Sequence, residues 1–225
     1  AGELASAEIE IAGASTEAGL IPDADGLVFV LGKTIEIRLG HHGDAERVFA
    51  GVIVARRATL AMSGGALVVE CAHPLYRSAL SARNRTWTDT RDSECIATLC
   101  AEHGVPVQVA PSGVHHRVLV QAGRSDWEFM RDRAVASGML LLTDGEGLQA
   151  GPLKPAGAAL LELLVGVSVR ELALETDLRA QPTGVEGQAW DAMTQELVRI
   201  RGEEPALPGF EQQRGIALAR VHGQM

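Results

Sequence analysis

Val120-Gln121-Ala122-Gly123-Arg124-Ser125-Asp126-Trp127-Glu128-Phe129 is the stretch that decides the fold, because it joins a strand to a capped helix. Ser125 can cap the helix while the Glu128 side chain reaches back to it, which satisfies two backbone donors at a helix start. Gly138 predicts the helix end, since glycine adopts the left-handed conformation without steric cost. Residues 139–143 then predict an apolar strand that ends in a turn at Asp144-Gly145. Spacing by itself fits an ordinary helix equally well.

The order of residues in this segment resembles that of one family, the VgrG and phage late control protein D family. Its members carry a Gln, a Ser-Asp-Trp-x-Phe and an Arg-Ala followed by Gly-Met. The resemblance extends from about residue 25 to residue 195 and includes strand-like segments on both sides. It implies structural roles for these signature residues: Gln121, Ser125, Asp126, Trp127, Phe129, Arg133, Ala134, Gly138 and Trp190.

The resemblance also implies a function. Members of this family form the hub beneath the spike of contractile phage tails, type VI secretion systems and extracellular injection systems. A homotrimer with two similar barrels per chain would present six near-equivalent modules, so that a hexameric inner tube can seat on a trimeric spike. The implied partners are further copies of the chain, the inner tube protein, and spike tip and baseplate proteins. No catalytic residue, cofactor or metal is implied, and the particular contractile system stays open.

The chain is predicted to be mainly β with an α+β insertion. Alternating charged and apolar residues at 8–11 and 34–39 indicate half-buried antiparallel strands. We expect a first tube-like β-barrel at 1–72, the α+β insertion at 73–152, a second tube-like β-barrel at 153–201 and a C-terminal extension towards a spike at 202–225. The two β regions share no clear sequence repeat, so their duplication rests on the resemblance alone.

Local patterns refine this division. Residues 27–31 and 34–39 predict a hairpin around Gly32-Lys33, and the glycines of 62–65 predict a tight turn between strands at 48–55 and 67–72. Thr90 or Asp92 can cap a helix that runs through His103. The apolar phase slips near Arg170-Glu171, which predicts a β-bulge in a strand region at 160–178.

Composition excludes some partners. The formal net charge is −9 and the two lysines, Lys33 and Lys154, belong to no basic run, so nucleic-acid binding is not expected. No apolar run approaches the roughly 18 residues of a membrane span, and no secretory signal is visible. We therefore expect synthesis in the cytoplasm, no stable membrane insertion, and assembly into a phage-tail-like particle or secretion apparatus.

Three cysteines, Cys71, Cys95 and Cys100, form no C-x-x-C pair. A spacing of five places Cys95 and Cys100 on different faces of a helix. They are interpreted as small buried hydrophobic residues of a reducing compartment.

Motifs that suggest chemistry are outweighed by structural interpretations. Gly32-Lys33-Thr34 lacks the earlier glycine of a phosphate-binding loop, because position 27 is leucine. The adjacent pairs His41-His42 and His115-His116 lack zinc-ligand spacing and predict surface histidines. Carboxylate pairs that could serve acid and base catalysis, Glu203-Glu204 and Asp89 with Asp92, are expected in solvated segments without raised pKa values.

Three aromatic residues, Trp127, Phe129 and Trp190, could in principle stack on a sugar, but we expect them to anchor cores or subunit contacts. Two rival functions stay open. A tail-associated cell-wall hydrolase would need a separate α-rich domain with a positioned glutamate, which the sequence does not offer. A monomeric barrel that binds a small molecule is the other alternative.

Overall fold

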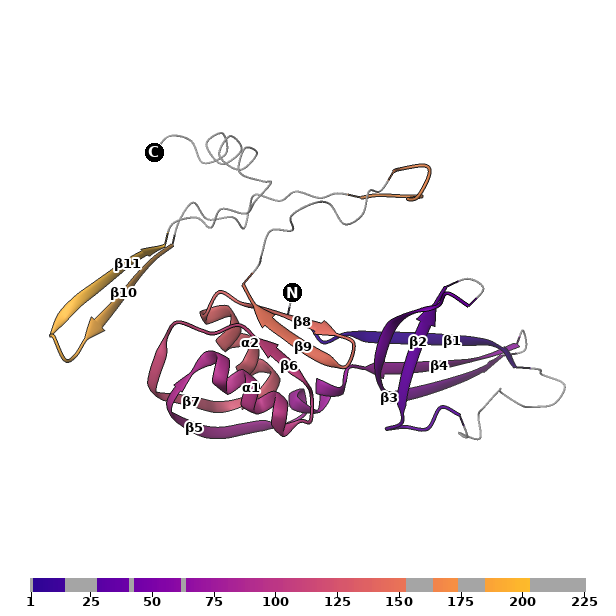
Figure 1. Cartoon of the computed structure of the whole chain (residues 1–225). Coiled ribbons are helices and arrows are strands. Elements are labelled where there is room, and N and C mark those ends of the chain that lie inside the picture. The colour runs from indigo at the N-terminus through magenta and orange to yellow at the C-terminus, as the bar shows by residue number, and fades with distance from the viewer. Residues whose placement is uncertain are drawn as a thin grey trace. The chain divides into compact units, whose positions relative to one another are not determined.

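The computed structural model describes residues 2–14, 28–40, 43–61, 64–152, 164–173 and 185–202 (Figure 1). The chain divides into two compact units, Ala1–Leu153 and Lys154–Met225. The described residues are mainly β with a helical insert, as the sequence predicts.

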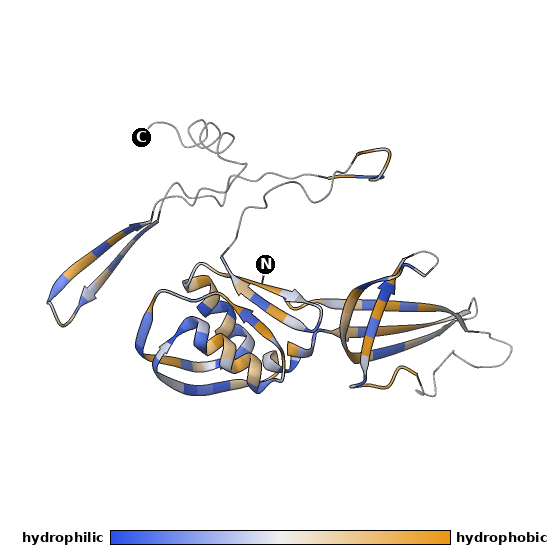
Figure 2. Ribbon diagram, viewed as in Figure 1, coloured by the Kyte–Doolittle hydropathy of each residue, from blue (hydrophilic) through white to orange (hydrophobic). Residues whose placement is uncertain are grey.

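The N-terminal part of the first unit is a four-stranded antiparallel sheet. Its strands are β1 (Ser6–Ala14), β2 (Thr34–Leu39), β3 (Glu46–Ala61) and β4 (Gly64–Ala72), in the order β1-β4-β3-β2. The predicted alternation holds, because Ile35 and Ile37 pack on the core while Glu36 is exposed. Figure 2 shows the same alternation as bands along β2. The core of this sheet consists of Phe49, Ile53, Leu67, Val69 and Cys71.

The strand β3 is long enough to pair with two neighbours in succession. Residues up to Val52 pair with β2, and residues from Val52 onward pair with β4. Register shifts at Ile37/Arg38 and at Ile53/Ala55 mark irregularities of the kind that bend a strand.

One expected feature of this sheet is wrong. Residues 28–31 form no strand; instead Gly32 has φ +81°, and its N–H donates to the Ile53 carbonyl of β3 at 2.8 Å. The tight connection predicted within 62–65 is confirmed, because Gly64 lies opposite Ala61, although Gly64 and Gly65 themselves already belong to β4. Residues 62–63 lie outside the described part of the chain.

The rest of the first unit is the α+β region. After the 3-10 helix η1 (Pro74–Ala79) come two strand–helix pairs, β5 (Ala82–Arg91) with α1 (Asp92–Glu102), and β7 (His115–Ser125) with α2 (Asp126–Ala136). β5 and β7 pair antiparallel. A three-stranded sheet, β6-β9-β8, is formed by β6 (Val107–Val109), β8 (Leu140–Asp144) and β9 (Gly147–Gly151), with β6 parallel to β9.

Both predicted helices are confirmed, with one correction. The N-cap of α1 is Arg91, whose extended backbone places its N–H 2.9 Å from the Glu94 carboxylate, and not Thr90 or Asp92. At the end of α2, Gly138 has φ +66° and directly follows the C-cap residue Ser137.

The two helices share one hydrophobic core. Leu75, Ile96, Leu99 and Met130 are fully buried in it. All three cysteines are free and buried, which confirms their interpretation as small hydrophobic residues. Burial raises the pKa of the Cys100 thiol to about 12.

In the second unit, β10 (Val185–Asp191) and β11 (Glu196–Gly202) form an antiparallel hairpin. The expected strand with a bulge near Arg170-Glu171 is wrong for the described residues 164–173. These form a turn in which the Gly166 N–H donates to the Val169 carbonyl at 2.8 Å, made possible by φ +87° at Gly166. The remainder of 160–178 and the extension 203–225 lie outside the described residues.

Gly51 provides a test of the packing in the N-terminal sheet. A Cβ at this position would lie 2.5 Å from the Ala72 carbonyl oxygen, a backbone atom that cannot rotate away. We expect Gly51→Ala to lower the free energy of unfolding by about 1–3 kcal/mol, measured by urea denaturation. Gly113→Ala, where a Cβ meets nothing within 4 Å, is the control and should change stability little. Equal effects would contradict this account of β3.

Candidate functional site

Three signature residues, Gln121, Ser125 and Asp126, meet at the first turn of α2, where Asp126 is almost fully buried. One carboxylate oxygen accepts a hydrogen bond from Gln121 Nε2 at 2.9 Å. The other accepts from His103 Nε2 at 2.9 Å and pairs with the half-exposed Arg83 guanidinium at 3.2 Å. A buried carboxylate is tolerated because three donors surround it.

Gln121 orients this cluster from β7. Its Nε2 also donates to the Arg124 carbonyl at 3.0 Å, so both amide hydrogens are used within a few residues of the helix start. Its Oε1 has no hydrogen-bond partner among the described residues. The side chain therefore serves as a double donor that holds the strand-to-helix turn.

A second buried carboxylate, Asp92, occupies the first position of α1. Ser137 Oγ donates to it at 2.6 Å, Arg133 lies 3.6 Å away, and His116 Nε2 lies 3.1 Å away without hydrogen-bond alignment. The expectation that Asp89 and Asp92 are both solvated is therefore wrong for Asp92, whereas Asp89 is exposed. The expectation of a surface position is wrong for His116 as well, since its side chain is mostly buried.

The two carboxylates connect the helices reciprocally. Asp92 begins α1 and binds Ser137, the C-cap of α2, whereas Asp126 begins α2 and binds His103, the C-cap of α1. The helices therefore lie antiparallel, with a negative charge at each N-terminus, where the helix dipole favours it. We call these sets of contacts the Asp92 cluster and the Asp126 cluster.

The start of α2 has the predicted capping box. The Glu128 N–H donates to Ser125 Oγ, and the Glu128 carboxylate accepts from the Ser125 backbone N–H and hydroxyl, both at 2.9 Å. These hydrogen bonds stabilise the ionised carboxylate and hold the pKa of Glu128 below its ordinary value.

Two of the three aromatic signature residues, Trp127 and Phe129, anchor the core of the α+β region. Trp127 and Phe129 are both buried, and the Phe129 ring stacks on Trp87 of β5 with centroids 6.3 Å apart. Arg85 covers the Trp87 ring at 4.6 Å. Trp190, by contrast, is 64% exposed on β10 in the other unit and anchors no core among the described residues.

Eight of the nine signature residues thus lie within 121–138, from the end of β7 to the residue after the C-cap of α2. Sequence reasoning did not connect Asp92 with them, and it missed His103 and Arg83, which complete the Asp126 cluster. One signal could have revealed Asp92, because each helix begins with an Asp two residues before the Glu of its capping box: Asp92 before Glu94, and Asp126 before Glu128.

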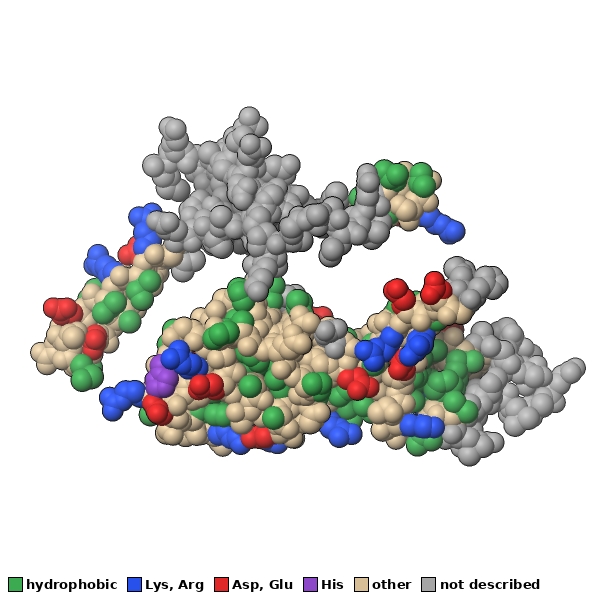
Figure 3. All heavy atoms as spheres, viewed as in Figure 1, with side chains coloured by type: hydrophobic (Ala, Val, Ile, Leu, Met, Phe, Trp, Pro, Cys, Tyr) green, Lys and Arg blue, Asp and Glu red, His purple; other side chains and the backbone are tan. Residues whose placement is uncertain are grey.

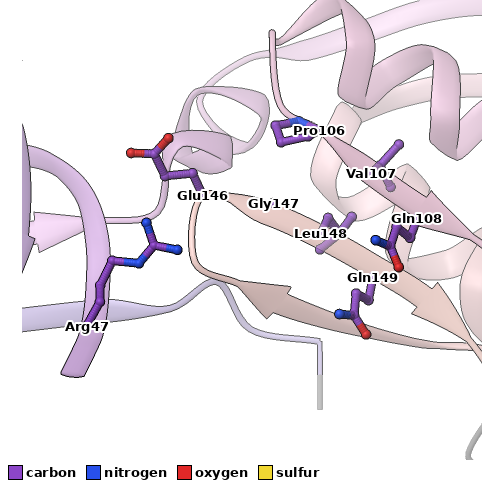
Figure 4. A pocket seen from close by; sticks show the side chains of 8 residues that line it. All are labelled: Arg47, Pro106, Val107, Gln108, Glu146, Gly147, Leu148 and Gln149. Carbon is purple, nitrogen blue, oxygen red and sulfur yellow. The ribbon is translucent and has the colours of Figure 1, made fainter.

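A polar hollow of about 470 Å³ lies between β3 and the three-stranded sheet. Figure 4 shows Arg47 and Glu146 at one end, and Gln108 and Gln149 beside each other on neighbouring strands. A guanidinium, a carboxylate and two amides can bind a polar ligand, but nothing in the arrangement pairs a nucleophile with a base.

The described residues include neither a metal-binding cluster nor a membrane-spanning helix. No three or more His, Cys, Asp or Glu side chains that the structure describes gather to hold a metal ion. None of the helices there is both long and apolar enough to cross a membrane. The pairs His41-His42 and Glu203-Glu204 lie outside the described residues. On the face seen in Figure 3, acidic and basic side chains are interspersed.

Solved structures with a similar fold include tail proteins and a component of a secretion system. A tail protein from Neisseria meningitidis MC58 aligns with 91% of this chain and 60% of its own, at a TM-score of 0.63 and 13% identity. The 43 kDa tail protein of prophage MuSo2 from Shewanella oneidensis aligns with 64% of this chain and 44% of its own length, at a TM-score of 0.53 and 15% identity. A third structure is an E. coli component of the type VI secretion system, described as structurally similar to the T4 tail proteins gp27 and gp5. It aligns with 66% of this chain and 42% of its own length, at a TM-score of 0.50 and 13% identity.

The chain therefore shares its fold with tail proteins. Because the sequence identities are only 13–15%, this similarity concerns the fold alone. The chain belongs to the Alg8 N-terminal domain family, whose model matches residues 2–224. It spans between 42% and 60% of the length of the solved structures described above. No curated protein matches it.

The Asp126 cluster predicts that replacing its buried carboxylate with an amide lowers the free energy of unfolding. In Asp126→Asn, the amide would turn a donor towards Gln121 or towards His103 and Arg83. We expect the free energy of unfolding to fall by about 2–3 kcal/mol, less than for a fully enclosed pair because Arg83 is half exposed. Urea denaturation measures this. Asp132→Asn on the same helix, which loses only an exposed ion pair with Arg124, should cost at most about 1 kcal/mol. Equal losses would contradict the role of the Asp126 cluster.

The lowered pKa of Glu128 predicts that the stability of the fold depends on pH. Because its pKa is lowered from 4.5 in the folded chain, its contribution is fully present above that value and is lost as the pH falls through the lower, folded-state pKa. We expect Glu128→Gln to be less stable than the parent at pH 6, and the difference to shrink as the pH approaches 3. Thermal unfolding between about pH 6 and pH 3 measures it. A difference that stays constant over this range would exclude the capping carboxylate as its cause.

Proposed function

We propose that the protein is a structural hub or spike-base protein of a contractile injection apparatus, and not an enzyme. In this proposal three copies adapt a hexameric inner tube to a trimeric spike. The fold carries the proposal, because the solved structures that share it include two tail proteins, one of them from a prophage, and a component of a type VI secretion system. The tail protein from Neisseria also aligns with most of the chain, beyond the length of the first unit alone.

The order of the signature residues supports the hub family in particular. Gln121, Ser125 and Asp126 form one hydrogen-bonded turn, and Phe129 completes the core beneath it. We propose that the VgrG and late control protein D signature records the requirements of this strand-to-helix turn, since a Gln, a cap and a buried Asp are needed together. The signature residues are then framework residues and not a binding site.

The hairpin of the second unit supports assembly with a partner. Its cross-strand pairs put Ala189 with Val198 and Gly187 with Ile200 on one face, whereas Gln188 with Arg199 falls on the other. Val198 and Ile200 are 40% and 65% exposed. An isolated two-stranded hairpin is marginally stable in water, so an exposed aliphatic face favours burial against another sheet. We propose that this hairpin belongs to a second tube-like module at 153–201, that residues 1–72 form the first, and that the modules meet between copies.

The oligomeric state tests this proposal. Light scattering on the full chain should give the mass of three copies of the 23.8 kDa subunit. Ile200→Lys, on the aliphatic face, should shift the mass towards one copy at the same concentration, while Arg199→Glu on the opposite face should leave three. A monomer at all concentrations, or equal effects of both variants, would overturn the assembly through this face.

The position of the chain in a particle tests the hub role independently. A map of the assembled apparatus should locate the protein between the end of the inner tube and the spike, in contact with baseplate proteins. A cell-wall digestion assay tests the rival hydrolase, and measurable digestion by the purified chain would favour that alternative. Location elsewhere on the particle would exclude an adaptor.

A further inference from the structure

His73 is a fully buried histidine at the point where the N-terminal sheet gives way to the α+β region. It follows directly after β4, and its backbone N–H donates to the Ala5 carbonyl at 2.9 Å. Its carbonyl accepts from the Tyr76 N–H of η1 at 2.8 Å. The main chain of His73 therefore ties the end of β4 to the segment before β1 and to η1.

The imidazole adds two further connections. Its Nδ1 accepts a hydrogen bond from the Leu75 N–H at 3.2 Å, which caps η1. Its Nε2 lies 3.1 Å from the Gly147 carbonyl of β9. A carbonyl can only accept, so Nε2 carries the hydrogen and Nδ1 carries the lone pair. These bonds assign one neutral tautomer to the ring.

This arrangement has no place for a second ring proton. A hydrogen on Nδ1 would point at the Leu75 N–H, so that two donors face each other, and the positive charge would be buried. The bond that caps η1 would be lost. The Gly147 bond alone would then hold the ring between the two sheets.

We propose that His73 is an acid-sensitive link between the four-stranded sheet and the three-stranded sheet. The neutral ring joins the two sheets, and the protonated ring releases the start of η1. Gly147, whose carbonyl accepts the Nε2 hydrogen bond of His73, lines the polar hollow together with Glu146. Acid would thus loosen the joint beside this hollow. The inference is independent of the proposed hub function.

The charges around His73 set the direction of its titration. Burial lowers the pKa of the imidazole below 6.5, and this effect outweighs the opposing effects of the Gly147 hydrogen bond and the Glu146 carboxylate. Glu146 sits in the turn between β8 and β9, and Arg47 of β3 lines the same hollow. Since the released ring binds a proton more readily than the buried ring, the joint is intact above pH 6.5. It weakens as the pH falls from 6.5 towards the lower buried-state pKa.

Amide hydrogen exchange of the full chain tests this acid-sensitive link. The protection factor of the Leu75 amide, corrected for the intrinsic rate at each pH, should be constant above about pH 7 and should fall by up to about tenfold per pH unit below 6.5. His73→Gln keeps one donor and one acceptor but cannot titrate, so its Leu75 protection should not change with pH. His115→Gln, at an exposed histidine on β7, is the matched control and should keep the parent profile.

A second variant keeps the test decisive if His73→Gln fails to fold. Glu146→Gln removes a carboxylate that favours the protonated buried ring, so its buried-state pKa falls further. The loss of Leu75 protection should then begin at the same pH as in the parent but continue to a lower pH and become larger. Ring nitrogen shifts of His73 in the parent chain should follow the same titration by NMR. A Leu75 protection factor that stays constant between pH 7.5 and 4.5, or an unchanged profile in Glu146→Gln, would overturn the proposal.

Discussion

Two buried aspartates hold the α+β region together, and the rest of the unit depends on them. Each begins one helix and binds the residue that ends the other, so neither helix can shift along its axis without exposing a charge to an apolar core. The negative charges also lie at helix N-termini, where the backbone dipoles stabilise them. The shared core of Ile96, Leu99 and Met130 supplies the nonspecific attraction, and the aspartates decide the register in which it packs.

The same division between attraction and register recurs where the two β layers of the first unit meet. The N-terminal sheet has its own core around Ile53 and Val69, separate from that of the helices. His73 connects them through hydrogen bonds to Ala5, Leu75 and Gly147. A few directional contacts therefore fix how two independently packed layers join.

Local sequence patterns predicted much of this structure because the interactions behind them are local. The Ser125–Glu128 capping box, the left-handed Gly138 and the alternation along residues 34–39 each involve residues within a few positions of one another. The errors arose where a distant segment decides the outcome. Residues 28–31 read as a strand from their apolar run, but Gly32 and Lys33 are held by Ile53, some twenty residues further along the chain.

The sequence by itself determined the β character of the chain, the two helices with their caps, and the burial of the three cysteines, because periodicity and capping act over one or two turns. Tertiary structure alone decided that Asp92 is buried against Ser137 and not solvated, that His103 and Arg83 join Asp126, and that His73 is locked in one tautomer. Each of these contacts joins residues from separate elements. Their energies depend on desolvation, which exists only once the layers have packed.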